Sequence, residues 1–358
     1  MAPGIGPKSY KKLVGFFNSA SNVQEASLLD LRSILDESTA EKVFEFLKSS
    51  KELDRELKLI ERHQVKVTFW DDPFYPEAFS KIEYPPQVFY LKGDLDFFKH
   101  YLTVSVVGTR KPTQYGKNAA CDFTKELVES GFYTASGFAL GIDTYAHRVT
   151  VESGSKTAAV LGCGLLVDYP FANRELKNRI FENGIVLSEF PLCYPPIPEN
   201  FPRRNRLIAA LGLGTLVVEA DIKSGSMITV MEALNQGKDI FAVPGSIYSP
   251  YSRGTNRLIS QGAKLVSTAR DIICEYKKEE NFEFDFSGQD EKTGAAPSDL
   301  TDSHYKVLDA VGWEPVNIEV ISKETDFLSY ELSKILLELE LEGLIKALPG
   351  KQYIRNRK

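Results

Sequence analysis

The chain has 358 residues, of which 43% are hydrophobic and 26% are charged. This is the composition of an ordinary globular protein with room for two or three domains, so collagen, low-complexity disorder and a small disulfide-framed scaffold are excluded. The net charge of −6 argues against a nucleic-acid-binding protein, because such proteins are usually basic.

The charge is unevenly distributed along the chain. Residues 1–100 hold 14 Lys and Arg against 16 Asp and Glu, residues 101–275 hold 18 against 16, and residues 276–358 hold 11 against 17. The negative excess therefore belongs mainly to the C-terminal quarter. The middle of the chain is slightly basic, and a small total can hide a concentrated basic site.

The four cysteines are scattered and form no C-x-x-C pair; they are Cys121, Cys163, Cys193 and Cys274. This spacing predicts neither a metal site nor a disulfide framework, and it is typical of a reducing compartment. The first residues lack the charged and apolar regions of a signal peptide, and the longest near-apolar run, 207–218, is too short to span a bilayer. We therefore expect a soluble, cytoplasmic protein without a membrane partner.

Residues 1–65 are predicted to form a small helical domain, because apolar residues such as Leu28, Leu31 and Leu35 recur at helical spacing. The stretch from Pro3 to Pro7, followed by three lysines within five residues, resembles the hairpin of a helix-hairpin-helix, which binds the DNA backbone. A purely structural helical cap is the alternative. The Pro- and aromatic-rich passage at 66–101 is expected to lie extended against the next domain.

Strands and helices alternate from residue 102 onward, which predicts βαβ units and a parallel sheet covered on both faces. About seven strands are expected, at 102–107, 132–136, 157–161, 185–188, 215–219, 240–243 and 264–266. The fold class is therefore α/β, with a doubly wound, mostly parallel sheet in a domain over residues 66–276.

Two further parts follow. Residues 277–300 are rich in charged residues, Gly and Pro. They contain too little apolar surface to offset the conformational entropy lost on ordering, so they are predicted to be a linker. Residues 301–358 show helical spacing at 304–311, 316–323 and 327–342, followed by a two-strand hairpin at 343–354. Three helices and a hairpin indicate a winged helix.

The loops after the strands are where a parallel sheet binds its ligands. Gly108 allows a tight turn after the first strand, and Arg110 next to it carries a planar fork suited to phosphate, although a plain turn with a solvated arginine is the alternative. Asp143 is a plausible N-cap of the helix after the second strand. The glycines there do not form G-x-G-x-x-G, so a dinucleotide fingerprint is absent. The nearby His147 is more simply explained as a structural residue.

Two later loops also favour an anion. Arg203, Arg204 and Arg206 lie at a predicted helix N-terminus, whose free N–H groups and dipole attract negative charge. Ser224–Ser226 begins the next helix and could cradle a phosphate, without being a nucleotide-hydrolysing P-loop. These residues alone predict one electropositive, hydroxyl-lined groove for a phosphate-bearing ligand, and they leave open whether that ligand is a nucleotide or a strand.

Seven stretches, taken in order, resemble one family. They are Val-Gly-Thr-Arg at 107–110, Ser-Gly-Phe-Ala-Leu-Gly-Ile-Asp at 136–143, Ala-Val-Leu-Gly-Cys-Gly at 159–164, Tyr-Pro at 169–170, Asn-Phe-Pro-Arg-Arg-Asn-Arg at 200–206, Glu-Ala with Lys-Ser-Gly-Ser at 219–226 and Ala-Val-Pro-Gly-Ser at 242–246. Each stretch alone is weak, but their succession is specific and resembles the DprA (Smf) family of DNA-processing proteins.

The resemblance implies that residues 66–276 form an extended Rossmann-like domain that binds single-stranded DNA. It implies a non-enzymatic protein that uses no cofactor and no metal. Such proteins protect incoming strands in natural transformation, load the RecA recombinase and form homodimers through the Rossmann-like domain. The family's DNA pocket corresponds here to Gly108, Thr109, Arg110, Ser136, Gly137 and the segment Arg203, Arg204, Asn205 and Arg206, with support from Lys223, Ser224, Gly225 and Ser226. To these we add Gly164 and, as rings on which a base could stack, Phe138 and Phe171.

Two positions depart from the family pattern. Many relatives carry a basic residue just after the Tyr-Pro pair, where this chain has Phe171, and many carry Lys or Arg where it has Leu140. Both changes weaken the expected positive charge of the groove. Phe171 could compensate, because stacking on a base is worth roughly 1–3 kcal/mol and tolerates any sequence.

The winged helix invites a duplex-DNA interpretation, which its charges oppose. The segment 327–342 holds Glu331, Glu338, Glu340 and Glu342 against Lys334, whereas a helix that enters the major groove should be basic. Protein contact or regulation is favoured, and weak contact through the basic wing stays open.

Two other functions compete with single-strand binding. One is a nucleoside-monophosphate phosphoribohydrolase on a similar sheet, with Glu219 as its carboxylate, although the Pro-Gly-Gly-x-Gly-Thr loop of those enzymes is absent. The other is a signalling or scaffold module that binds a small nucleotide.

Overall fold

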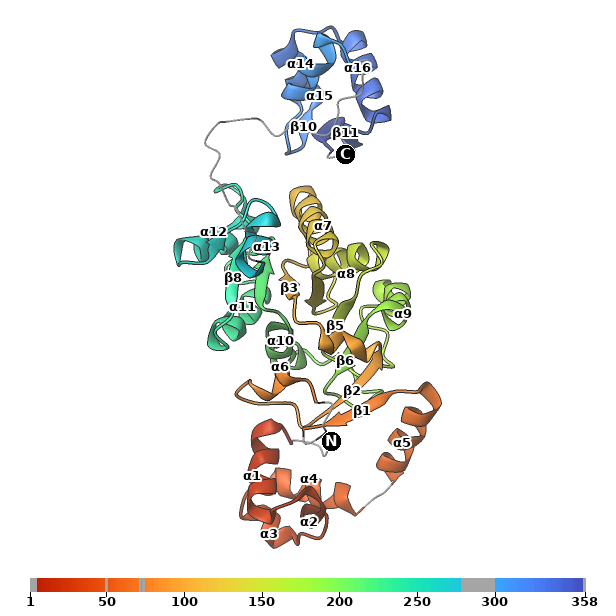
Figure 1. Cartoon of the computed structure of the whole chain (residues 1–358), viewed down its shortest axis with the longest axis vertical. Helices are drawn as coiled ribbons and strands as arrows, with labels where there is room; N and C mark the ends of the chain where they lie inside the picture. The colour runs from red at the N-terminus through yellow and green to blue at the C-terminus, as the bar shows by residue number, and fades with distance from the viewer. Residues whose placement is uncertain (1–4, 49–50, 71, 73–74, 278–299, 357–358) are drawn as a thin grey trace. The chain divides into compact units, whose positions relative to one another are not determined.

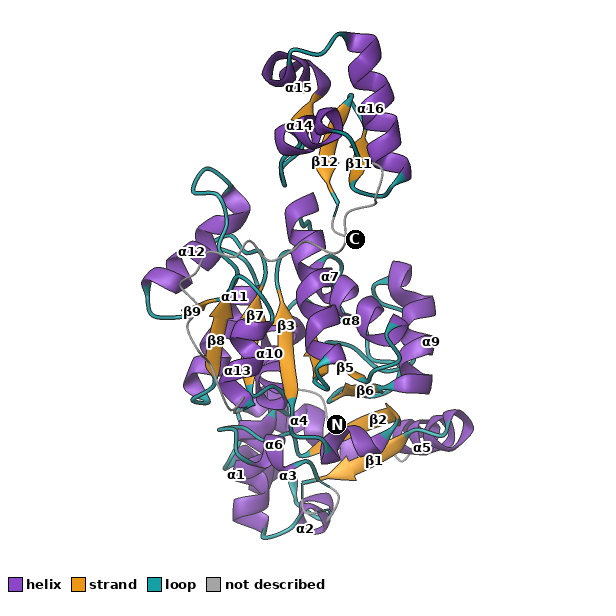
Figure 2. Ribbon diagram, turned by 45° about the horizontal axis from the view of Figure 1, so that its top comes forward, coloured by secondary structure: helices purple, strands orange, loops and turns teal. Residues whose placement is uncertain are grey.

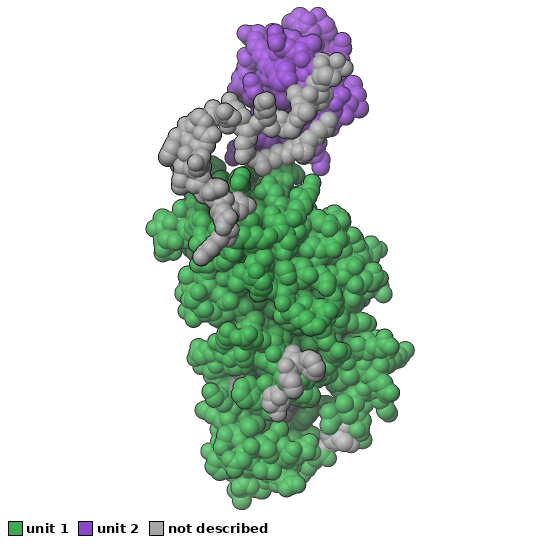
Figure 3. Space-filling model, in the orientation of Figure 1, with its two compact units in different colours: residues 1–278 green, residues 279–358 purple. Residues whose placement is uncertain are grey.

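A computed structural model describes residues 5–48, 51–70, 72, 75–277 and 300–356. The chain divides into two compact units, residues 1–278 and residues 279–358 (Figure 3). Nearly all of the predicted linker, residues 278–299, lies outside the described residues, as do Pro3 and Gly4 of the predicted hairpin.

Short helices open the first unit (Figure 1). Ser27 and Asp36 each cap a helix, because their side chains accept hydrogen bonds from the backbone N–H three residues later. Leu31 is fully buried in the core of this part, as its helical spacing predicts. The helices are α1 (Pro7–Phe17), α2 (Ala20–Gln24), α3 (Leu28–Arg32), α4 (Glu37–Leu47) and α5 (Lys51–His63).

Within the described part of the first unit, nine strands form one sheet in the order β1-β2-β6-β5-β4-β3-β7-β8-β9. The strands from β3 to β9 pair with one another in parallel. At one edge β2 pairs antiparallel with β6, and β1 pairs antiparallel with β2. Their bounds are β1 (Lys66–Phe69), β2 (Val88–Gly93), β3 (Thr103–Val107), β4 (Tyr133–Ser136), β5 (Thr157–Leu161), β6 (Ile185–Ser188), β7 (Gly214–Val217), β8 (Asp239–Ala242) and β9 (Lys264–Leu265).

The doubly wound parallel sheet is confirmed, and the prediction of seven strands was too low. The passage at 66–101 was expected only to lie extended, yet it supplies β1 and β2, which add two strands to the sheet edge. Phe89 and Leu91 of β2 are buried in the main core, so burial of alternate apolar residues drives this addition.

Helices cover both faces of the sheet (Figure 2). Val104 and Val106 of β3 pack with the helices of one face, while the Ser105 hydroxyl on the other face donates to the Ile208 carbonyl at 2.7 Å. The helical elements are α6 (Glu77–Ser80), η1 (Leu95–Lys99), α7 (Gln114–Glu129), α8 (Ile142–Glu152), η2 (Phe171–Asn173), α9 (Arg174–Asn183), α10 (Asn200–Leu211), α11 (Ser226–Asn235), η3 (Pro250–Ser252), α12 (Arg253–Ser260) and α13 (Arg270–Tyr276).

The strand order reverses at β3. The chain runs outward from β3 through β4, β5 and β6, then returns to place β7, β8 and β9 on the other side. The loops after β3 and β7 therefore diverge at the carboxyl end of the sheet, which is the position at which such sheets bind ligands.

The second unit is a winged helix, as predicted. Its three helices enclose a core that includes Val307, Ile321 and Leu336. The segment 316–323 was predicted as helix from its start, but its first two residues form β10 and the helix begins at Ile318. The elements are α14 (Asp302–Ala310), β10 (Val316–Asn317), α15 (Ile318–Thr325), α16 (Ser329–Leu341), β11 (Ile345–Leu348) and β12 (Gln352–Arg355).

Candidate nucleic-acid interface

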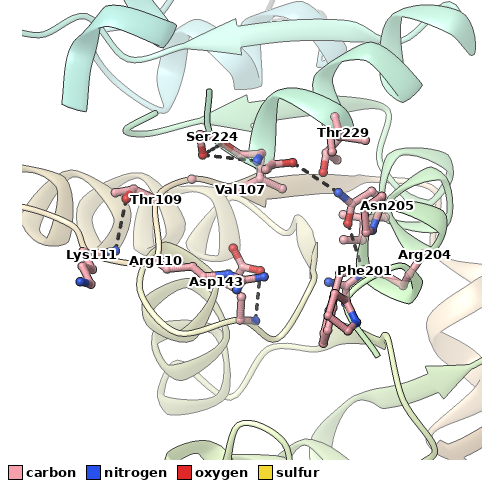
Figure 4. A pocket seen from close by; sticks show the side chains of 18 of the residues that line it. Val107, Thr109, Arg110, Lys111, Asp143, Phe201, Arg204, Asn205, Ser224 and Thr229 are labelled. Atoms are coloured by element: carbon pink, nitrogen blue, oxygen red, sulfur yellow. Dashed lines mark hydrogen bonds between the residues drawn. The ribbon is translucent and has the colours of Figure 1, made fainter. Parts of the chain in front are cut away.

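An open groove of about 690 Å³ lies at the carboxyl ends of β3, β4 and β7 (Figure 4). The loops predicted to converge there do so. Of the sequence-predicted site residues, the structure brings eight into the groove lining: Gly108, Thr109, Arg110, Arg204, Asn205, Ser224, Gly225 and Ser226. A smaller cavity of about 60 Å³ adjoins it, and the two share Arg110, Ala139, Tyr169 and Phe201.

Close backbone contacts shape the floor of the groove. A Cβ on Gly108 would lie 2.6 Å from the Ile142 side chain, so only glycine allows α8 to approach the end of β3. The Thr109 N–H donates to the Glu219 carbonyl at 2.7 Å, which joins the β3 loop to the β7 loop. Gly141 has a φ of +88° and would place a Cβ 2.3 Å from the Thr109 carbonyl oxygen. The glycines of the two loops therefore stand where the backbone makes close approaches that a Cβ would block.

Two aromatic rings and a guanidinium form the rim. The Arg110 guanidinium lies 5.7 Å from the centroid of the Phe201 ring, and the Tyr169 ring lies 5.6 Å from the same ring. Gly162 makes room for this arrangement, because a Cβ there would meet Phe201 at 2.7 Å. Arg110 and Lys111 are exposed, so both cations are free to meet a ligand in solvent. Sequence reasoning did not single out Tyr169 and Phe201 as rings of the groove, although both belong to the quoted stretches.

Phe138 and Phe171, the rings that the sequence predicts to stack on bases, are not among the described residues that line the groove. Phe138 is 2% exposed and packs against His147, and it reaches only the small cavity. Phe171 is 73% exposed on η2, but it is not among the described residues that line either cavity. The aromatic rings that line the groove are therefore those of Tyr169 and Phe201, and not those of Phe138 and Phe171.

Arg204 is buried beneath the groove. Its guanidinium donates to the Gly137 carbonyl at 2.6 Å and to the Val160 carbonyl, so it ties the β4 loop to β5. Burial lowers the pKa of Arg204 to about 10, which leaves it charged at neutral pH. Burial also raises the pKa of Asp143, and the charge of Arg204 opposes that rise.

Asp143 organises the β4 loop in a different way from the one predicted. Gly141 is the N-cap of α8, so the predicted N-cap at Asp143 is wrong. The Asp143 carboxylate instead accepts hydrogen bonds from the N–H groups of Gly137 at 3.1 Å and Ala139 at 3.2 Å. The carboxylate of Asp143, in the first turn of α8, thus holds the preceding loop in its curved path.

The other two arginines of the run point away from the groove lining. Arg206 is buried in a paired contact with Glu189, whose two carboxylate oxygens lie 2.5 and 2.9 Å from its guanidinium nitrogens. Arg203 lies 5.6 Å from the Phe190 ring, and its Nε and Nη2 are buried with no hydrogen-bond partner among the described residues. Of the three arginines predicted to face the anion, Arg204 is therefore the one that the structure places at the groove.

Three further predicted residues support the loops from behind or lie outside the lining. The Ser136 hydroxyl is buried and donates to the Val106 carbonyl at 2.6 Å. Gly164 is packed where a Cβ would lie 2.2 Å from the carbonyl oxygens of Pro191 and Leu192. Lys223 is exposed on the β7 loop and is not one of the described lining residues.

The β7 loop presents hydroxyls at the start of α11. The side chains of Ser224 and Ser226 share a hydrogen bond of 2.8 Å, and Asn205 donates to the Gly225 carbonyl at 3.4 Å. Glu219 organises the loops: its carboxylate accepts from the Thr113 N–H at 2.9 Å and the Thr113 hydroxyl at 2.6 Å. Burial raises the pKa of Glu219, while the hydrogen bonds from Thr113 oppose this.

Other titratable groups near the sheet fit structural roles. His147 is fully buried with Nδ1 2.8 Å from the Thr157 hydroxyl, and burial lowers its pKa to about 3. Over the described part of the chain, no group of His, Cys, Asp and Glu is arranged to hold a metal ion. No helix there combines the length and the apolar composition that a bilayer span requires.

The comparisons with known proteins agree with the fold. Residues 66–277 match the family model of DNA recombination-mediator protein A, and residues 291–351 match that of the DprA winged helix domain. The Smf protein of Synechocystis is 32% identical over 98% of this chain and 96% of its own length. The DNA processing protein DprA of Bacillus subtilis is 40% identical over 56% of this chain and 68% of its own length.

Two solved structures are also similar. DprA from Streptococcus pneumoniae aligns with a TM-score of 0.68 at 33% identity, covering 77% of this chain and 95% of that one. DprA from Helicobacter pylori, whose structure concerns its single-stranded DNA binding mode, aligns with a TM-score of 0.54 at 32% identity, covering 59% of this chain and 95% of that one.

Proposed function

The chain belongs to the DNA recombination-mediator protein A family, and on that premise we propose that its groove binds single-stranded DNA without sequence preference. The observation that carries the proposal is the rim, where Arg110 lies beside the rings of Tyr169 and Phe201. Single-strand sites combine cations that follow the backbone with rings on which bases stack. The groove holds both within one opening of about 690 Å³.

Each part of the groove has a distinct role in this proposal. Arg110 and Lys111 neutralise phosphates from the exposed β3 loop, and the hydroxyls of Ser224 and Ser226 donate to phosphate oxygens. Bases turn toward Tyr169 and Phe201, where any base offers a π face. Arg204 adds buried positive charge below the strand and keeps the β4 loop in place through its bonds to Gly137 and Val160.

Binding of labelled oligo-dT should be tight and should weaken steeply as salt is raised, because bound phosphates release counterions. A matched duplex should bind more weakly, since its bases are stacked inside and cannot reach Tyr169 and Phe201. Fluorescence anisotropy at two salt concentrations measures both ligands. Absence of oligo-dT binding by the unaltered protein would contradict the proposal.

Removing either groove ring should weaken oligo-dT binding. Tyr169→Ala and Phe201→Ala are each expected to cost about 1–3 kcal/mol of binding free energy, the range found for one stacked base. Tyr169→Phe is the matched control, because it keeps the ring and removes only the hydroxyl. Phe171→Ala tests the ring outside the lining; if it alone lowered affinity, the bases would stack on η2 instead of in the groove.

The phosphoribohydrolase alternative is disfavoured by the position of Glu219, the carboxylate that the sequence suggested for it. Asp143, which does line the groove, is held by the N–H groups of Gly137 and Ala139. Glu219 is held by Thr113 and is not among the described residues that line the groove. A phosphoribohydrolase would need such a group at the substrate. Release of free base from a nucleoside monophosphate would overturn this assignment, and displacement of oligo-dT by an excess of one nucleotide would favour a small-nucleotide module.

The cellular role proposed here follows from the family relationship. We propose that the protein acts in the cytoplasm, protects incoming single strands, loads RecA onto them and works as a homodimer. Nuclease protection of a bound strand and RecA filament formation on a strand coated with a single-strand-binding protein measure the first two activities. Light scattering measures the oligomeric state, and a monomer at all working concentrations would exclude the dimer.

A further inference from the structure

The winged-helix unit carries an apolar surface that the proposed function of the groove does not use. Tyr330, Leu337 and Leu341 of α16 are 71%, 57% and 78% exposed. They are seven and four residues apart, so they share one side of the helix. With Ser333 and Lys334, which are exposed between them, they form what we call the α16 stripe. The stripe spans about 16 Å, or roughly three helical turns.

The stripe is separate from the side of α16 that stabilises the fold. Leu332, Ile335, Leu336 and Leu339 are buried in the core of the unit. Leu337 and Leu341 of the stripe are not among the residues of this core. Exposed apolar side chains in a row on a helix are typical of a surface that meets another protein.

Carboxylates surround the stripe in fixed positions. The Glu331 carboxylate accepts from the Leu328 N–H at 3.3 Å, Glu338 lies 2.8 Å from His304, and Glu340 accepts from the Ala347 N–H at 2.9 Å. Residues 300–356 together hold ten Asp and Glu against six Lys and Arg. The surface around the stripe is thus negative, and Lys334 is itself 3.9 Å from Glu338.

This combination selects the class of partner. A DNA duplex requires cations facing its phosphates, whereas the outward side of α16 offers a tyrosine, two leucines and neighbouring carboxylates. An amphipathic helix with an apolar side and basic flanks matches both features, since its apolar side covers the leucines and its cations meet the glutamates. We propose that the α16 stripe docks a basic amphipathic helix of a partner protein.

The test uses the full chain and a displayed library of random peptides long enough for three to four helical turns. Peptides selected on the unaltered protein are measured individually against it and against the Leu337→Ala/Leu341→Ala variant. We expect these peptides to carry apolar residues at helical spacing and an excess of Lys and Arg. Their affinity should fall by about tenfold or more in the double variant and should weaken as salt is raised.

A matched control separates the stripe from general apolar exposure. Val320→Ala removes an apolar side chain that is 44% exposed on α15 and should leave the affinity of the peptides unchanged. Thermal unfolding checks that both variants fold. Peptides that bind the double variant equally well, or that are neutral or acidic, would overturn the proposal. A short labelled duplex that loses affinity in the double variant would identify the stripe as a nucleic-acid surface instead.

Discussion

Arg110→Ala should weaken the binding of single-stranded DNA by about ten- to a hundredfold. A hydrogen bond between a charged donor and phosphate contributes about 1.5–3 kcal/mol, and each 1.4 kcal/mol is a factor of ten. Arg110 is exposed at the rim, next to the Phe201 ring, so its guanidinium is accessible to a phosphate. The loss should be similar for oligonucleotides of different sequence, because phosphate contacts carry no base information.

Lys125→Ala is the control for this prediction, since it removes the same charge from α7, outside the groove lining. Lys125 is exposed and lies 3.9 Å from Glu129. In Arg110→Ala, the slope of log affinity against log salt should fall by about one, and in Lys125→Ala it should stay unchanged. Equal losses in both variants would mean that the protein responds to its total charge and not to a contact made by Arg110.

The fold was predictable because its dominant signals are local. Apolar runs such as 157–161 end in glycine and alternate with helical stretches, and these features alone indicate parallel βαβ units. The β1–β2 edge was missed because the consecutive apolar residues Phe89 to Leu91 hide the alternation of β2, and prolines crowd the segment between the two strands. Phe89 and Leu91 are buried only through contacts with residues far away in sequence. Short strands at a sheet edge depend on such contacts more than on their own propensity.

The candidate site was predictable at the level of loops and not of individual side chains. The arginines at 203, 204 and 206 follow each other on a helix, where successive residues point in different directions. Arg204 consequently reaches the β4 loop, while Arg206 forms an ion pair with Glu189, a buried carboxylate that directly follows β6. Arg206 turns away from the groove because Glu189 is buried and pairs with it. The sequence shows only that a carboxylate follows a strand at this point, and that is a weak sign that the carboxylate is buried.

Arg204→Met should lower the free energy of unfolding by about 3–5 kcal/mol, the usual cost of leaving a buried charge without its partner. The substitution removes the donor to the Gly137 and Val160 carbonyls and the positive charge that offsets the burial of Asp143. Urea denaturation measures the change. Arg174→Met is the control: its side chain is 60% exposed beside Asp168, and such surface pairs contribute about 0–1 kcal/mol.

The pH dependence of this loss identifies its cause. Burial raises the pKa of Asp143, so folding favours the protonated carboxyl, and that contribution to stability is lost as pH rises through the folded-state pKa. Without Arg204 the pKa of Asp143 rises further, and the penalty at neutral pH grows. The loss of unfolding free energy caused by Arg204→Met should therefore be smaller near pH 4 than near pH 7. In an Asp143→Asn background this pH dependence should disappear, because an amide does not titrate. A deficit that is the same at both pH values would assign the whole loss to the two carbonyls.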